Sequence, residues 1–124
     1  MKLAFLIGVG SFVGGISRYL LTFLIDEKFF HSTTLGTFAV NIIGCFLIGI
    51  VFAVSDKGSI SQEWRFFLAS GLLGGFTTFS AFSYQNISLL QNGRVAQAAL
   101  YITSSVLLGL AATYAAILLF KSNV

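Results

Sequence analysis

The stretch best suited to chemistry is GGFTTFSAFS, residues 74–83, which combines glycines, hydroxyl side chains and phenylalanines. Phe79 and Phe82 are three residues apart, so in a helix they lie on one face, with Ser80 and Ser83 beside them. The edge of a phenyl ring is electropositive and can face an anion without binding it as strongly as a buried lysine would. Ordinary packing against lipid or core is the alternative role for these rings.

The backbone of the same stretch is predicted to leave the helical conformation. Gly74 and Gly75 are poor helix formers, and the hydroxyls of Thr77 and Thr78 compete for backbone hydrogen bonds. Unwinding would free the carbonyl oxygens of residues 74–77, and such oxygens are ligands for hard cations such as Na⁺. The sequence therefore predicts a break near the middle of a helix, with carbonyls available to a cation.

A second apolar stretch carries a polar stripe. Thr37, Asn41 and Gly44 recur at helical spacing, so they share one face. The Asn41 amide offers two N–H donors and an acceptor oxygen. It either bonds a neighbouring helix or presents a donor to a permeating anion.

A stripe of the same kind occurs near the C-terminus. Its members are spaced four residues apart: Tyr101, Ser105, Gly109 and Thr113. Such a stripe packs helices together or lines a path, and the matching stripe at Thr37 and Asn41 favours the path.

Arg18 is the one charged residue inside the first apolar stretch. It lies one helical turn after Gly14 and therefore on the same face. Either its side chain extends to the membrane surface, or its charge lines a water-filled vestibule and concentrates anions there.

Helices within a membrane must position these residues. The chain of 124 residues is 56% hydrophobic and only 9% charged, whereas charged residues form about a quarter of a soluble domain. Each of its four apolar stretches reaches the roughly 20 residues that a spanning helix needs. The sequence predicts an all-α membrane protein, a single domain with short polar joints at residues 26–28, 55–65 and 91–94. The predicted spans are residues 3–25, 33–55, 66–91 and 95–120.

Basic residues are nearly balanced between the two ends of these helices. One end carries Lys2, Lys57, Arg65 and Lys121, and the other carries Lys28 and Arg94. With Arg18 added to the second end, the count is four against three. Because a surplus of basic loop residues sets the orientation of a membrane protein, so small a bias predicts insertion both ways round.

Acidic residues are confined to the joints between the predicted spans. The four acids lie in the joints: Asp26, Glu27, Asp56 and Glu63. A proton-driven, dual-topology multidrug exporter, the main alternative function, needs a carboxylate in the membrane. His31 has no evident nucleophile or metal partner, so no enzymatic activity is expected, and the single cysteine, Cys45, excludes an intrachain disulfide. An unselective membrane protein, in which the stripes only pack helices, is a further alternative.

Three motifs carry a resemblance to a known family. They are GGISRY at residues 14–19, GTFAVNIIGCFLIG at residues 36–49 and GLLGGFTTFSAFS at residues 71–83. Together with the length and the four spans, they resemble the Fluc (CrcB) family of microbial fluoride channels. The resemblance implies a passive, fluoride-selective channel of the cell inner membrane that exports cytoplasmic fluoride. It also implies an antiparallel, dual-topology homodimer with two pores and a structural Na⁺ between the subunits.

The resemblance also assigns roles to individual residues. The expected fluoride pore consists of Phe79, Phe82, Asn41, Ser80, Tyr101, Ser105 and Thr37. Arg18 is expected in the vestibule, and the carbonyls of Gly74 and Thr77 are expected to bind Na⁺. Gln85 and Thr113 belong to a polar track, in which Gln85 replaces a glutamate of many relatives and Gly109 replaces a serine.

Overall fold

The computed structural model describes residues 1–32 and 34–121. Every regular element in these residues is helical, and four helical segments are long and apolar enough to cross a membrane. They extend over Lys2–Phe29, Leu35–Asp56, Gln62–Gln91 and Val95–Lys121. The predicted all-α architecture with four membrane helices is confirmed. Residue 33, the expected first residue of the second span, lies outside the described residues.

Two of the four segments are composed of several helical elements. The first segment is α1 (Lys2–Phe23) followed by the π-helix η1 (Leu24–Phe29). The second segment is α2 (Leu35–Asp56), and the fourth is α6 (Val95–Lys121). The third segment consists of α3 (Gln62–Arg65), the π-helix η2 (Phe66–Leu73), α4 (Gly74–Phe76) and α5 (Phe79–Gln91).

Helical structure extends further than the polar joints suggested. The sequence predicts a joint at residues 26–28, but these residues form the last turn of the first segment. The Asp26 carboxylate accepts a hydrogen bond of 2.7 Å from the Gly36 N–H, so it caps the start of α2. At the second joint, residues 55–65, Ser61 caps α3 by accepting a bond from the Trp64 N–H. Polar side chains of the predicted joints therefore cap the helices that follow.

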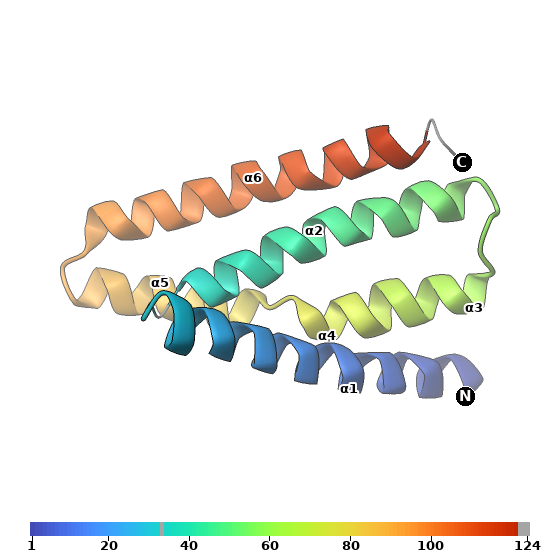
Figure 1. The fold of residues 1–124 in the computed structure, drawn as a ribbon, viewed down its shortest axis with the longest axis horizontal. Helices are drawn as coiled ribbons and strands as arrows, with labels where there is room; N and C mark the ends of the chain where they lie inside the picture. The colour runs from blue at the N-terminus through green and yellow to red at the C-terminus, as the bar shows by residue number, and fades with distance from the viewer. Residues whose placement is uncertain (33, 122–124) are drawn as a thin grey trace.

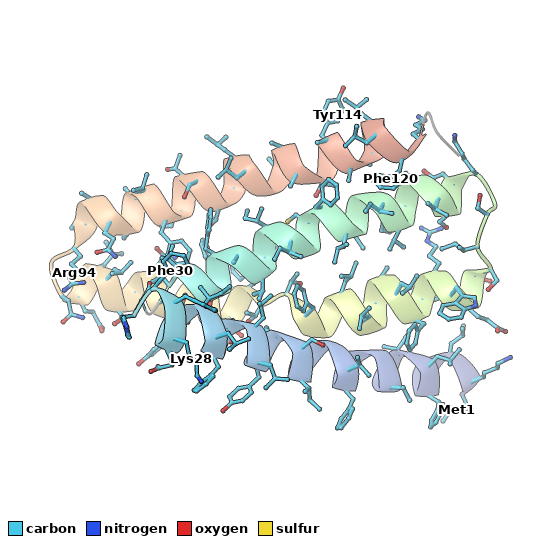
Figure 2. All side chains as sticks on the ribbon, in the orientation of Figure 1. Met1, Lys28, Phe30, Arg94, Tyr114 and Phe120 are labelled. Atoms are coloured by element: carbon cyan, nitrogen blue, oxygen red, sulfur yellow. The ribbon has the colours of Figure 1, made fainter. Side chains whose placement is uncertain are left out.

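The segments are arranged so that α1 and α6 lie on opposite sides of α2 and the third segment (Figure 1). Both termini and the α2–α3 joint lie at one end of the molecule. Figure 2 shows Met1 and Phe120 at that end and Lys28, Phe30 and Arg94 at the other. Successive segments therefore run in opposite directions between the two ends of the molecule.

Close backbone contacts hold the third segment between its neighbours. A Cβ atom added to Gly14 of α1 would overlap the carbonyl oxygen of Leu72 in η2. A Cβ atom added to Gly44 of α2 would overlap the Thr77 methyl group. Glycine at these two positions therefore lets α1 and α2 approach the middle of the third segment, as small residues do in membrane proteins.

The buried part of the single chain is small. One apolar cluster contains Leu89, Ala98 and Tyr101, with Phe38 and Phe82 packed against it. Many large apolar side chains are exposed instead, including Phe5 and Phe79. Such a surface is expected where lipid or another membrane helix, and not water, surrounds the chain.

Candidate functional site

The helical backbone of the third segment is interrupted at Thr77 and Thr78. Thr77 has φ −93° and ψ 156°, and Thr78 has φ −148° and ψ 120°, so both residues are extended. The sequence predicts unwinding from Gly74, whereas Gly74 and Gly75 are helical. The interruption lies later because β-branched threonines suit the extended conformation. In addition, Thr78 caps α5 by accepting a hydrogen bond of 3.2 Å from the Ala81 N–H.

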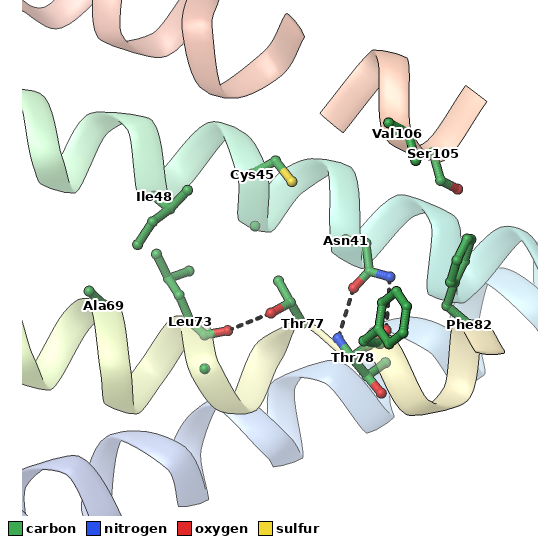
Figure 3. Close-up of a pocket in the computed structure, with 13 residues that line it drawn as sticks. Asn41, Cys45, Ile48, Ala69, Leu73, Thr77, Thr78, Phe82, Ser105 and Val106 are labelled. Carbon is green, nitrogen blue, oxygen red and sulfur yellow. Dashed lines mark hydrogen bonds between the residues drawn. The ribbon is translucent and has the colours of Figure 1, made fainter. Parts of the chain in front are cut away.

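Asn41 of α2 holds the extended segment from the side. Its Nδ2 donates to the Thr78 carbonyl at 3.0 Å, and its Oδ1 accepts from the Thr78 N–H at 2.8 Å (Figure 3). Both ends of one amide therefore bond the backbone of one residue. The sequence left open whether Asn41 bonds a helix or faces an ion. Asn41 bonds the extended backbone between two helices, and the second N–H of its Nδ2 remains available as a donor.

The interruption adjoins a pocket of about 380 Å³. Three segments line it, as Figure 3 shows, with Asn41 and Cys45 from α2 and Ser105 from α6. The full lining is Asn41, Gly44, Cys45, Ile48, Ala69, Leu73, Gly74, Thr77, Thr78, Phe79, Phe82, Ser105 and Val106. The pocket is thus mostly apolar, with a few polar groups contributed by different helices.

Ser105 has an unusual environment in this pocket. Its Oγ is buried and has no hydrogen-bond partner among the described residues. Buried hydroxyls are normally bonded, so an unpartnered one is unusual. A free hydroxyl on the pocket wall is a ready donor to an anion.

The two phenylalanines of the central motif are adjacent on α5. Their ring centroids are 5.6 Å apart and their planes are tilted by 42°. Phe82 also packs edge to face on Tyr101, with centroids 5.0 Å apart and an angle of 74°. Phe82 is half-buried, whereas Phe79 is 78% exposed in the single chain. The rings therefore extend from the core of the chain to its surface.

Gln85 connects three helices through a second polar group beyond the pocket. Its Nε2 donates to the Thr37 Oγ1 at 2.9 Å, and its Oε1 accepts from the Tyr101 hydroxyl at 2.8 Å. Thr37 and Tyr101 are both buried. The amide therefore uses its donor side towards α2 and its acceptor side towards α6. Thr37 and Tyr101 thus lie in this network and not in the pocket lining.

The remaining predicted site residues lie around these two groups. The exposed Ser80 lies beside the pocket, with its Oγ 3.3 Å from the Thr78 Oγ1. Thr113 donates to the Cys45 carbonyl at 2.8 Å and so joins α6 to α2. Arg18 donates from its Nε to the Gly75 carbonyl at 3.1 Å. Thr113 and Arg18 therefore each contact another segment of the chain, whereas Ser80 contacts its own segment.

Thr78 is the pocket residue whose importance sequence reasoning missed. Its hydroxyl caps α5, and its backbone takes both bonds of Asn41. A threonine directly before a helical motif is a recognisable capping signal, so the cap could have been predicted. The pairing with Asn41 could not, because it depends on how two helices are rotated relative to each other.

Comparison with known proteins identifies the family. The family model described as "CrcB-like protein, Camphor Resistance (CrcB)" matches residues 5–117. The chain belongs to the CrcB family. Among similar CrcB proteins, the fluoride-specific ion channel FluC of Flavobacterium psychrophilum is 44% identical over 122 residues, which cover 98% of each chain. The FluC channel of Campylobacter jejuni strain 81-176 is 42% identical over 115 residues, covering 93% of this chain and 94% of the relative.

A third CrcB relative gives the same result at a lower sequence identity. The fluoride-specific ion channel FluC of Leptospira interrogans is 39% identical over 122 residues, covering 98% of this chain and 96% of the relative. These CrcB relatives are named as ion channels, which are not enzymes. Family membership and four membrane-capable helices make the chain a multi-pass membrane protein.

Proposed function

We propose that the chain forms a passive, fluoride-selective pore that lets cytoplasmic fluoride leave the cell. Its similarity to channels named as fluoride-specific supports the ion. The single observation that carries the proposal is the pocket lined by Asn41, Phe79, Phe82 and Ser105, which gathers donors and ring edges suited to a small anion.

The chemistry of this pocket suits conduction. Fluoride must exchange a tight hydration shell for protein contacts, here the free N–H of Asn41, the Ser105 hydroxyl and the ring edges of Phe79 and Phe82. None of these groups carries a full charge. Conduction requires binding strong enough to admit the ion and weak enough to release it, which modest contacts provide.

A second copy of the chain would complete the pore. The pocket opens on the surface of one chain, and Phe79 at its edge is largely exposed. The nearly equal numbers of basic residues at the two ends favour insertion in both orientations. Two antiparallel copies would cover each other's pocket face, giving two equivalent pores in one dimer.

The interruption offers oxygen ligands for a structural Na⁺ on the dimer axis. In a continuous helix, the Gly74 and Thr77 carbonyls would accept from the N–H groups of Thr78 and Ala81. Here Thr78 donates to Asn41, and Ala81 donates to the Thr78 hydroxyl. The two carbonyls therefore lose their helical donors, which fits the expected ligand set. Two chains would supply four such oxygens, and the ion would join the two interruptions electrostatically.

The direction of transport follows from acid–base chemistry. Hydrogen fluoride crosses membranes as a neutral molecule and dissociates in a less acidic cytoplasm, which traps the anion. A passive pore in the inner membrane lets fluoride leave down its gradient without an energy source. A proton-driven exporter is less well supported, since Asp26, Glu27, Asp56 and Glu63 all lie near the ends of the membrane segments.

Efflux from liposomes tests the proposal. Purified protein is reconstituted, and the release of fluoride and of chloride is followed with ion-selective electrodes. Rapid fluoride release with little chloride release is expected. Equal release of the two ions would indicate an unselective pore, and release of neither from correctly inserted protein would contradict a passive channel.

A further inference from the structure

Arg18 reaches the interruption of the third segment from α1. Its Nε donates to the Gly75 carbonyl at 3.1 Å, across 57 residues of sequence. In a continuous helix that carbonyl would accept from the N–H of Phe79, four residues later. Phe79 is instead the first residue of α5, beyond the extended Thr77 and Thr78. The guanidinium thus bonds a carbonyl that the interruption deprives of its helical partner.

The packing of α1 fixes this contact in place. A Cβ atom added to Gly75 would lie 3.0 Å from the Ser11 Cα and 3.1 Å from the Gly15 backbone nitrogen. The backbone of α4 therefore lies directly on α1, with no side chain between them. Arg18 is half-buried and begins one turn after Gly14, which makes a similar contact with Leu72. The short distance from α1 to the Gly75 carbonyl is therefore determined by packed backbones.

We propose that Arg18 is a positioning residue for the interruption, and more than a charge in a vestibule. Its Nε–H replaces the Phe79 N–H and stabilises the extended conformation of Thr77 and Thr78. It also reserves the Gly75 carbonyl, because a cation on that oxygen would meet the guanidinium at hydrogen-bond distance. The Gly75 carbonyl is thereby withdrawn from the cation, while the carbonyls of Gly74 and Thr77 stay available to it. This second part rests on the Na⁺ site proposed above.

Lysine at position 18 separates the two roles. It keeps the positive charge, but its Cε occupies the place of the arginine Nε, so no donor stands at that position. Glutamine removes the charge, but its Nε2 stands where the arginine Nε stood, so an N–H donor remains at that position. A vestibule charge would survive in Arg18→Lys and be lost in Arg18→Gln, whereas the positioning contact is lost in Arg18→Lys and retained in Arg18→Gln.

The experiment measures how much Na⁺ each protein needs. Wild type, Arg18→Lys and Arg18→Gln are purified without Na⁺ and reconstituted, and fluoride efflux is measured against Na⁺ concentration. We expect the half-maximal Na⁺ concentration to rise about tenfold or more in Arg18→Lys, as for loss of one charge-assisted contact, and to rise less in Arg18→Gln, which retains the donor. Lys2→Gln is the control, since Lys2 pairs with Glu63 at the far end of α1. A wild-type Na⁺ requirement in Arg18→Lys would overturn the proposal.

A measurement on the unaltered protein decides the case in which both variants fail to assemble. The Nε–H of Arg18 should exchange with solvent about tenfold or more slowly than that of a free arginine side chain, because it is bonded to Gly75. Exchange at the free rate, followed by ¹⁵N-detected NMR, would overturn the contact. If fluoride efflux by the wild-type protein does not depend on the Na⁺ concentration, the proposed Na⁺ site is wrong. The exchange rate of the Nε–H still tests the Arg18 contact in that case.

Discussion

At the scale of single residues, the side chains of the candidate site have one of two uses. Asn41, Gln85 and Thr113 bond other helices through defined donors and acceptors. Ser105 differs, because its buried hydroxyl has no partner among the described residues, and Phe79 differs because its ring is exposed. The first use stabilises the arrangement of helices, and the second leaves groups available to an ion.

Replacing Phe82 or Phe79 by isoleucine tests the role of the rings. Isoleucine keeps apolar bulk but lacks the electropositive ring edge, which is worth about 1 kcal/mol per contact. Fluoride efflux should therefore fall at least about fivefold in each variant. Phe5→Ile is the control, because Phe5 is 71% exposed on α1, outside the pocket lining. Parental efflux from intact Phe82→Ile and Phe79→Ile dimers would mean that the rings only pack.

At the scale of elements, the third segment shows what sequence predicts and what it does not. Apolar length predicted four membrane helices, because each must span the same hydrocarbon thickness. The extended residues Thr77 and Thr78 lie within the stretch where the sequence predicts unwinding, but the two glycines of that stretch do not unwind. Gly74 and Gly75 are poor helix formers, but both remain helical; α1 packs directly on Gly75, and tertiary contacts override propensity. The Asn41–Thr78 bonds also depend on helix rotation, which periodicity within one helix does not determine.

Gly14 and Gly15 provide a matched test of the packing between α1 and the third segment. A methyl group at Gly14 would overlap the Leu72 carbonyl, whereas no atom lies within 4 Å of one at Gly15. Gly14→Ala should lower the free energy of unfolding by about 1–3 kcal/mol, as overpacking does. Gly15→Ala should leave it nearly unchanged. Unfolding in mixed micelles gives the free energy of unfolding of both variants. Equal values would show that α1 can move away from the third segment without loss of stability.

At the scale of the whole molecule, one chain leaves its candidate site incomplete. The core is small, the pocket opens on the surface, and the ring at its edge is exposed. All of these features are consistent with a partner that covers the pocket face. Both termini lie at one end of the chain, so the orientation of a chain can be read from either terminus (Figure 1).

The proposed antiparallel dimer predicts that C-termini occur on both sides of the membrane. A single cysteine is added after the last residue of a Cys45→Ala variant and labelled with an impermeant maleimide. About half of the chains should react in intact cells and the rest only after lysis, because the loop charges are nearly balanced. Adding two lysines to the α2–α3 joint should shift the ratio. Reaction of all chains from one side would contradict dual topology.

The single tryptophan of the chain, Trp64, lies in α3 with its ring edge to face on Phe67. It is 58% exposed and belongs to the end of the molecule that carries both termini (Figure 1). In an antiparallel pair, the two indole rings must therefore lie near opposite faces of the bilayer. Iodide added outside sealed vesicles would quench about half of the fluorescence, since only one indole of each pair is accessible. The fluorophore already present in the chain thus reports the orientation of the chains without any label.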